Sequence, residues 1–411
     1  MTPVLKLPMT QFSSPGLRRV FDVLGPGNAM LVGGCVRAAV LDDRRAYLDI
    51  DIATKLTPEE VTKRCYEAGM KVIPTGVEHG TVTVVPDGPQ AFEITTLRRD
   101  VETDGRRAVV AFTESWEEDA QRRDFTMNTL LMDMDGNVYD PTGTGVADLK
   151  AGLVRFVGDA DTRIKEDSLR ILRFFRFHAR YGKGMPNVTG YQACVHNRDL
   201  LKNLSRERVT GEVLKLLTAE DAAVSLKAMI EGGILEGLWQ KEWSEKGYNI
   251  LRWVAVSLEV EQPDMVLLMY CMKPENAQAL DELVAQFFVL SNRQKRFLND
   301  ILIVLNKVTD TAKKNTYLHG RDATIAATLL SKVYKNPAVD ATALEAAGIT
   351  VLQAPLLMFP ITARDIMFEF KIAEGKQLGD VLKQVEEWWL EYDGDAGKGV
   401  CLEQARRLLN T

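Results

Sequence analysis

The sequence predicts an α+β N-terminal head, with a mixed or antiparallel sheet flanked by helices, followed by an entirely helical remainder. Short apolar stretches with alternating polar residues recur up to about residue 140, separated by glycine, proline and helix-start signals. Beyond about Thr218, nearly all apolar residues follow helical spacing. The chain has 411 residues, more than one ordinary core accommodates, so roughly two to four domains are expected.

Composition narrows the class of protein. Hydrophobic residues make up 46% and charged residues 26% of the chain, as in ordinary soluble proteins. No apolar run reaches the length of about eighteen residues that a membrane span needs, so no membrane partner is expected. The five cysteines lie far apart without a Cys-x-x-Cys pair, which predicts reduced thiols and no zinc site. Residues 1–14 show no signal or transit pattern, which predicts a cytoplasmic location.

The first candidate site lies at a glycine turn. A helix over 14–24 is followed by a short apolar strand at 29–32, then by Gly33 and Gly34, and a second helix opens near Arg37. Paired glycines allow the backbone to approach a phosphate closely, and a helix N-terminus with an arginine favours anionic groups. The sequence therefore predicts a phosphate-binding turn here.

The next strand carries two carboxylates. Residues 48–54 alternate with period two, so Asp49 and Asp51 point to one face and the aliphatic residues point to the other. Such a pair also occurs in strands that merely face water, but here a phosphate-binding turn lies one strand earlier. Residues 91–96 alternate again and add Glu93 as a third carboxylate. Because carboxylate oxygens suit hard divalent cations, we expect Mg²⁺ at Asp49 and Asp51.

Other elements of the head follow from local signals. A helix is predicted over 57–68, and strands over 80–85 and 91–96 are joined by a proline-glycine turn. Residues 97–112 are charged and lack periodicity, so a mobile, charged loop and a solvated hairpin are both open, and composition alone favours the hairpin. Residues 116–128 are expected to be helical, and 133–140 to form a hairpin.

A long basic helix is predicted over 163–181. Arg170, Arg173 and Arg176 share one face with Arg180, and apolar residues fill the opposite face. Between 163 and 183 there are seven basic residues against two acidic ones, although the whole chain has a net charge of −6. This local excess predicts that any nucleic-acid phosphates bind at particular surfaces only. A solvated basic face on a core helix is the alternative interpretation.

The spacing of Asp167 and Arg170 suggests a device for reading bases. Three residues apart, they are neighbours on one side of a helix. A carboxylate accepts from an exocyclic amine, and a guanidinium donates to a ring nitrogen or carbonyl. Cytosine and adenine present an amine beside an acceptor, whereas uracil and guanine present a carbonyl at the position of the amine. One such pair would accept CTP and ATP and reject UTP and GTP.

Four short motifs occur along the chain in a recognisable order. The segments 31–37 (Leu-Val-Gly-Gly-Cys-Val-Arg), 48–54 (Leu-Asp-Ile-Asp-Ile-Ala-Thr), 122–128 (Arg-Arg-Asp-Phe-Thr-Met-Asn) and 166–170 (Glu-Asp-Ser-Leu-Arg) resemble, in this order, those of class II tRNA nucleotidyltransferases. These are the CCA-adding enzymes of the polymerase-beta-like superfamily. The resemblance is specific over about the first 217 residues and general beyond them. One position departs from the family pattern, because Ala38 stands where an acid usually follows the arginine.

The resemblance implies template-independent addition of CCA to the tRNA 3′ end from CTP and ATP, by two-metal-ion nucleotidyl transfer with release of pyrophosphate. It implies catalytic roles for Asp49, Asp51 and Glu93. It implies that the partner is tRNA, bound at its acceptor end and elbow, and not DNA. It also implies a flexible loop over 97–112, which tips the expectation there from a hairpin to a mobile loop. The residues implied in nucleotide binding are Gly33, Gly34, Arg37, Arg123, Asp124, Asn128, Asp167, Arg170, Arg173 and Arg176.

Four domains are expected: a nucleotidyltransferase catalytic head over 1–157, a helical nucleotide-recognition neck over 158–220, a helical body over 221–335 and a helical tRNA-binding tail over 336–411. Within the neck, the helix over 204–217 is expected to support the base-reading helix, with Arg206 and Arg208 mainly structural. The alternatives are an A-adding or poly(A) polymerase sibling and a non-catalytic RNA-binding protein on a degenerate scaffold.

Overall fold

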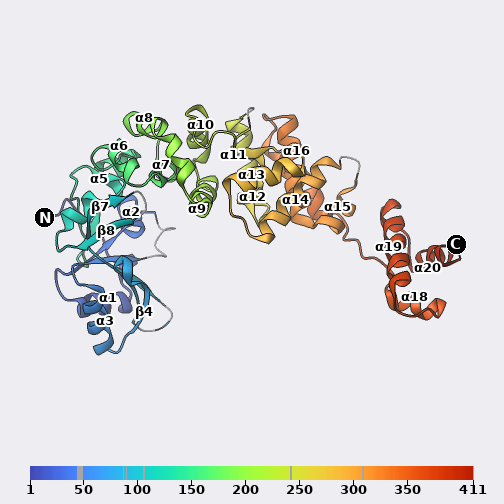
Figure 1. Ribbon diagram of the computed structural model, residues 1–411, viewed down its shortest axis with the longest axis horizontal. Helices are drawn as coiled ribbons and strands as arrows, with labels where there is room; N and C mark the ends of the chain where they lie inside the picture. The colour runs from blue at the N-terminus through green and yellow to red at the C-terminus, as the bar shows by residue number, and fades with distance from the viewer. Residues whose placement is uncertain are drawn as a thin grey trace. The chain divides into compact units, whose positions relative to one another are not determined.

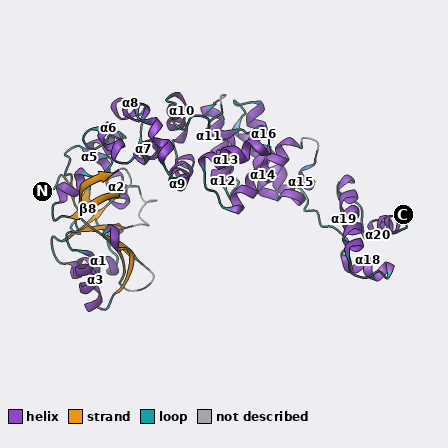
Figure 2. Cartoon of the chain, in the orientation of Figure 1, coloured by secondary structure: helices purple, strands orange, loops and turns teal. Residues whose placement is uncertain are grey.

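The computed structural model describes residues 1–43, 50–86, 88, 90–104, 107–240, 243–307 and 310–410. The chain divides into two compact units, Met1–Glu236 and Gly237–Thr411. The strands of the described residues all lie in the first unit, and the second is built from helices (Figures 1 and 2). This confirms the predicted fold class; the finer division into four domains stays a prediction. No helix in the described ranges is long and apolar enough to cross a membrane.

The head is organised on an eight-stranded sheet with the order β1-β10-β9-β2-β3-β6-β5-β4. Its strands are β1 (Leu5–Lys6), β2 (Ala29–Val32), β3 (Asp51–Thr54), β4 (Lys71–Gly76), β5 (Thr81–Val85), β6 (Phe92–Thr96), β9 (Leu131–Met132) and β10 (Asn137–Tyr139). Neighbours are antiparallel except β3 and β6, which run parallel, so the sheet is mixed as predicted. The edge strand β4 escaped prediction because it contains Pro74 and an irregular register.

Helices of the head begin where capping signals place them. They are α1 (Pro15–Leu24), α2 (Gly34–Leu41), α3 (Pro58–Glu67), α4 (Trp116–Gln121) and α5 (Gly145–Ala151). The side chain of Ser14 accepts a hydrogen bond from Leu17 N, and that of Thr57 from Glu60 N. Residues 122–125 are not helical, so the predicted helix over 116–128 consists of α4 and a short 3₁₀ helix (η4, Thr126–Asn128). Further 3₁₀ helices are η1 (Thr10–Phe12), η3 (Val77–His79) and η5 (Arg198–Asn203).

The expected loop over 97–112 is instead a hairpin. Strands β7 (Arg98–Asp104) and β8 (Arg107–Phe112) pair antiparallel, with Arg98 opposite Phe112 and Asp104 opposite Arg107. The prediction of a mobile loop is therefore wrong, and the hairpin that composition alone favoured is correct. The family resemblance had tipped the prediction to a loop, whereas backbone pairing of two strands needs no alternating apolar face.

The basic helix is interrupted where the sequence predicts continuity. It consists of α6 (Ala160–Glu166) and α7 (Leu169–Tyr181), and Asp167 between them has an extended backbone (φ −153°, ψ 104°). The Asp167 carboxylate accepts a hydrogen bond from Leu169 N at 3.1 Å, an interaction by which aspartate competes with helix continuation. The first unit continues with α8 (Val188–His196), α9 (Arg206–Leu217) and α10 (Ala222–Glu231).

The second unit contains α11 (Glu245–Ser257), α12 (Pro263–Met272), α13 (Ala277–Phe287), α14 (Asn292–Asn306), α15 (Ala312–His319), α16 (Arg321–Lys335), α17 (Ala341–Gln353), α18 (Ala363–Phe370), α19 (Lys376–Glu391) and α20 (Lys398–Leu409). Residues 265–272 of α12 are buried on every side. The last three helices enclose a separate apolar cluster around Trp389 and Ile366.

Candidate active site

A pocket of about 630 Å³ lies in the first unit. Strands β2, β3 and β6, helices α2 and α4, the 122–128 segment and neck helices α7 and α9 supply its walls. Eleven of the predicted site residues line it: Gly33, Gly34, Arg37, Asp51, Glu93, Arg123, Asp124, Asn128, Asp167, Arg170 and Arg173. The fold thus brings together residues that are up to about 140 positions apart in the sequence.

Carboxylates and the glycine turn meet at one side of this pocket. Asp51 and Glu93 are register partners on the parallel strands β3 and β6. Gly33 has φ +73°, which favours glycine, and a Cβ there would lie 3.0 Å from Asp51 Oδ2, a tight contact that would displace the carboxylate. Asp49 lies outside the described residues. Asp51 and Glu93 both line the pocket and offer the oxygen donors that divalent cations prefer, and the described residues contain no group of three or more potential metal ligands.

A chain of hydrogen bonds connects the glycine-turn helix to the neck. Arg37, which is buried, donates to Asn128 Oδ1 at 2.7 Å, and Asn128 Nδ2 donates to Asp124 Oδ1 at 2.7 Å. Arg173 on α7 completes the chain with an ion pair to Asp124 Oδ2 at 2.6 Å. Burial alone would raise the pKa of Asp124, but Arg173 and Asn128 together hold it below its ordinary value. This chain holds α2, the 122–128 segment and α7 in one arrangement.

Phe177 joins three of the arginines. The centroid of its ring lies 5.2 Å from the guanidinium carbon of Arg37, 5.4 Å from that of Arg173 and 4.5 Å from that of Arg176. The ring is 4% exposed and lines the pocket. Arg176 itself pairs with Glu212 at 2.5 Å and does not line the pocket, unlike the other predicted nucleotide-binding residues that the structure describes. The packing orders the basic face through cation–π contacts.

Asp119 is a pocket residue that sequence reasoning missed. Its buried carboxylate binds Arg122 at 2.7 Å and Arg123 at 2.8 Å, and it also accepts from Arg98 N at 3.2 Å. Burial raises its pKa, but Arg123 and Arg122 outweigh burial and hold the pKa below its ordinary value. The available signal was its position three and four residues before two arginines. Asp119 therefore fixes both guanidinium groups at the pocket wall.

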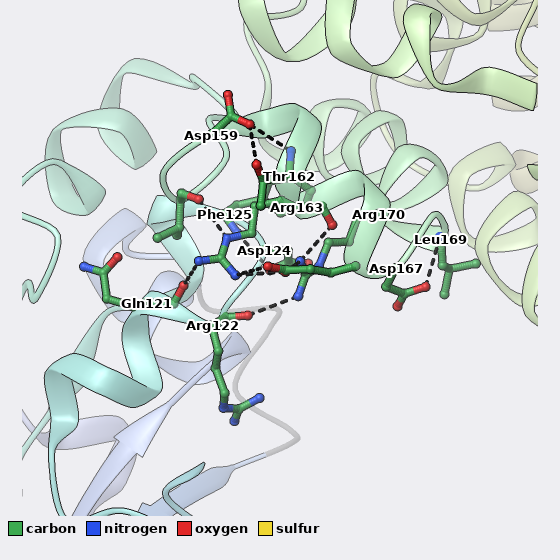
Figure 3. Close-up of polar contacts among 12 residues, drawn as sticks. Gln121, Arg122, Asp124, Phe125, Asp159, Thr162, Arg163, Asp167, Leu169 and Arg170 are labelled. Carbon is green, nitrogen blue, oxygen red and sulfur yellow. Dashed lines mark hydrogen bonds and ion pairs between the residues drawn. The ribbon is translucent and has the colours of Figure 1, made fainter. Parts of the chain in front are cut away.

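The two candidate base-reading residues are held by different partners (Figure 3). Arg170 donates to Glu166 at 2.5 Å and to the backbone oxygens of Arg163 and Arg122. Asp167 accepts from Leu169 N and pairs with Arg208 Nη2 at 2.7 Å. The expectation that Asp167 and Arg170 are neighbours on one continuous helix is wrong, because the helix breaks at Asp167. Both side chains nevertheless line the same pocket.

The departure at Ala38 leaves the turn intact. Ala38 is buried in α2 and lies outside the residues that line the pocket. Gly33 keeps its positive φ, and Arg37 keeps its hydrogen bond to Asn128. The pocket thus combines oxygen ligands at the strands, guanidinium groups along one wall, and a separately anchored acceptor and donor, Asp167 and Arg170. Such an arrangement suits a polyphosphate with a base that carries an amine.

Two family models match the chain. Residues 29–155 match the model described as "Poly A polymerase head domain", and residues 191–243 match "Probable RNA and SrmB- binding site of polymerase A". The first match includes the strands that carry Asp51 and Glu93, and the second includes α9, which carries Arg208.

Individual relatives agree with these models. The CCA-adding enzyme of Streptococcus pneumoniae serotype 19F is 32% identical over 365 residues, covering 87% of this chain and 88% of that protein. The mitochondrial CCA tRNA nucleotidyltransferase 1 of Danio rerio is 42% identical over 209 residues, covering 50% of this chain. The chain spans 48% of the length of that second relative. The structure of the Bacillus stearothermophilus CCA-adding enzyme in complex with CTP superposes with a TM-score of 0.74 at 25% identity, covering 96% of this chain and 98% of that one.

Proposed function

Because the chain belongs to the family of CCA-adding enzymes, we propose that it adds CCA to the 3′ end of tRNA from CTP and ATP without a nucleic-acid template. The observation that carries this proposal is the single pocket in which the carboxylates Asp51 and Glu93 accompany an acceptor and a donor suited to a base, Asp167 and Arg170. The first group suits phosphoryl chemistry, and the second suits discrimination between bases.

The proposed reaction is one nucleotidyl transfer per added residue. The terminal tRNA hydroxyl oxygen forms a bond to the α-phosphorus, the bond from this phosphorus to the β-phosphate bridging oxygen breaks, and pyrophosphate leaves. The hydroxyl proton passes to solvent. Nucleotidyltransferases of this family depend on a divalent metal, and we propose Mg²⁺ held by Asp51, Asp49 and Glu93. When bound, such ions neutralise phosphate charge and favour ionisation of the hydroxyl.

The residues of the chain position the nucleotide in this scheme. The backbone at Gly33 and Gly34 approaches the phosphates because no side chain intervenes. Arg123, fixed by Asp119, offers positive charge at the pocket wall. Asp167 accepts from the base amine, and Arg170 donates to the adjacent ring atom. Arg37, Asp124, Asn128 and Arg173 hold these walls together, and Arg176 supports them through Phe177.

Three tRNA transcripts test the proposal, one ending before the tail, one after the first C and one after the second C. Each is incubated with CTP, ATP or both, and the products are sequenced. Complete CCA on the first transcript supports the proposal. Addition of A alone to the CC-ending transcript would instead make the protein an A-adding enzyme, and long A tracts would make it a poly(A) polymerase. Binding of tRNA without incorporation would leave only an RNA-binding role.

Partners and location follow from the same proposal. tRNA is the proposed macromolecular substrate, with the helical second unit available for contacts beyond the 3′ end. The cytoplasmic location stays a prediction, supported by five cysteines that are all free and buried, as is usual in a reducing compartment.

A further inference from the structure

We propose that Arg208 is a positioning residue for base selection, which acts by holding the Asp167 carboxylate in the orientation that accepts the base amine. This inference rests on the proposed function, because it concerns how the same pocket distinguishes nucleotides. The sequence suggested a mainly structural role for Arg208, but the side chain lines the pocket.

The contact comes from a separate helix. Arg208 lies in the first turn of α9, and its Nη2 atom is 2.7 Å from Asp167 Oδ2. The second oxygen, Oδ1, accepts from Leu169 N at 3.1 Å. Each oxygen of the carboxylate therefore has one protein donor, and the two donors together fix the plane of the group. A carboxylate has about four acceptor positions, so acceptor capacity remains for a base amine.

The backbone at this point explains why a second helix is needed. Asp167 lies in the extended break between α6 and α7, so helical packing does not set its side-chain direction. Its side chain is 31% exposed, and that of Arg208 is 40% exposed. Without Arg208, the bond from Leu169 N restrains only one oxygen, and the carboxylate gains freedom to turn. A base that presents a carbonyl would then meet less repulsion.

Arg170, the proposed donor to the base, is held in place by partners other than Arg208. Arg170 is held by Glu166 and by two backbone oxygens, and its side chain is 13% exposed. Its position does not depend on Arg208. Loss of Arg208 should therefore loosen the acceptor while leaving the donor in place. This predicts a specific loss of discrimination at the amine position rather than a general loss of nucleotide binding.

The test compares incorporation of CTP and UTP on the transcript that ends before the tail. The variants are Arg208→Gln, Arg208→Lys and the matched control Lys215→Gln, which removes an exposed charge from the same helix. For Arg208→Gln we expect the ratio of kcat/KM for CTP to that for UTP to fall roughly tenfold, as for loss of one charge-assisted hydrogen bond. Arg208→Lys should recover part of the ratio, and Lys215→Gln should keep it.

A double variant shows whether Arg208 acts through Asp167. If it does, Arg208→Gln should lower the ratio no further in an Asp167→Asn background. An unchanged ratio in Arg208→Gln, or an equal fall in kcat/KM for both nucleotides, would overturn the inference. An additional full loss in the double variant would also overturn it. If the wild-type protein incorporated neither CTP nor UTP, the proposed function itself would be refuted. This outcome differs from those that overturn only the role of Arg208.

Discussion

Replacement of Asp119 by asparagine should destabilise the first unit measurably. The buried carboxylate receives both the Nε and Nη2 groups of Arg122 and of Arg123, at 2.7 to 3.0 Å. An asparagine of the same shape offers one acceptor oxygen and turns an amide N–H₂ toward a guanidinium. Removing one partner of a buried ion pair costs about 3–5 kcal/mol.

Two features of the structure reduce this cost. The Arg122 and Arg123 side chains are 19% and 18% exposed, so water can solvate them in part. Each also keeps a backbone acceptor, because Arg122 donates to Arg98 O and Arg123 to Asn128 O. We therefore expect the free energy of unfolding to fall by about 2–4 kcal/mol. For a unit of this size, the corresponding fall in Tm is about 5–10 °C.

Calorimetry of the full chain measures this change, with Glu117→Gln as a control that removes an exposed acid from the same helix and should change stability by less than about 0.5 kcal/mol. The effect should depend on pH. The folded pKa of Asp119 lies below its unfolded value, so its contribution is present above about pH 4 and disappears as the pH falls through the folded pKa. Equal stability of wild type and Asp119→Asn at pH 7 would refute the reasoning.

Three further predictions concern other parts of the molecule. Phe177→Leu should raise KM for CTP roughly threefold to tenfold, because the ring that packs against the arginine wall is lost; steady-state kinetics measures this, and an unchanged KM would contradict it. Gly33→Ala should lower kcat roughly tenfold or more, since a Cβ would lie 3.0 Å from Asp51 Oδ2 in a strained backbone; near-normal single-turnover rates would contradict it. In the second unit, Lys398 and the cap at Thr362 lower the pKa of Asp365 to about 2, so its stabilising effect should persist above pH 4 and vanish toward pH 2. Asp365→Asn should remove this acid-dependent part of the unfolding of helices α18–α20, as followed by circular dichroism, and an unchanged acid profile would count against the assignment.

Local signals in the sequence predicted the elements that supply the carboxylates and the glycine turn of the pocket. Alternation placed Asp51 and Glu93 on strands, and glycine pairing placed Gly33 at a turn, because both patterns depend on neighbouring residues only. The parallel pairing of β3 with β6 arises only when the whole sheet assembles, and no local pattern in the sequence specifies it. The family resemblance supplied what periodicity lacked, the grouping of these residues into one site.

Contacts between residues far apart in the chain could not be predicted from the sequence. Asp124 and Arg173 are 49 positions apart, and Asp167 and Arg208 are 41 apart, so no helical or strand period relates them. The break at Asp167 escaped prediction because the side chain competes with the helix for a backbone N–H, while the apolar period of the helix continues past it. A residue that caps a backbone N–H does not alter hydrophobic spacing.

Single-turnover incorporation by Asp51→Asn, together with its affinity for CTP, tests the central assignment most directly. Asp22→Asn, which replaces an exposed acid outside the pocket, is the control. We expect incorporation by Asp51→Asn to fall roughly a hundredfold or more, because phosphoryl transfer depends on charge neutralisation by the divalent ions that this carboxylate is proposed to hold. The Kd for CTP should change little, because Asp167 and Arg170 remain in place. Near-normal incorporation by Asp51→Asn would contradict the assignment of this pocket as the catalytic site.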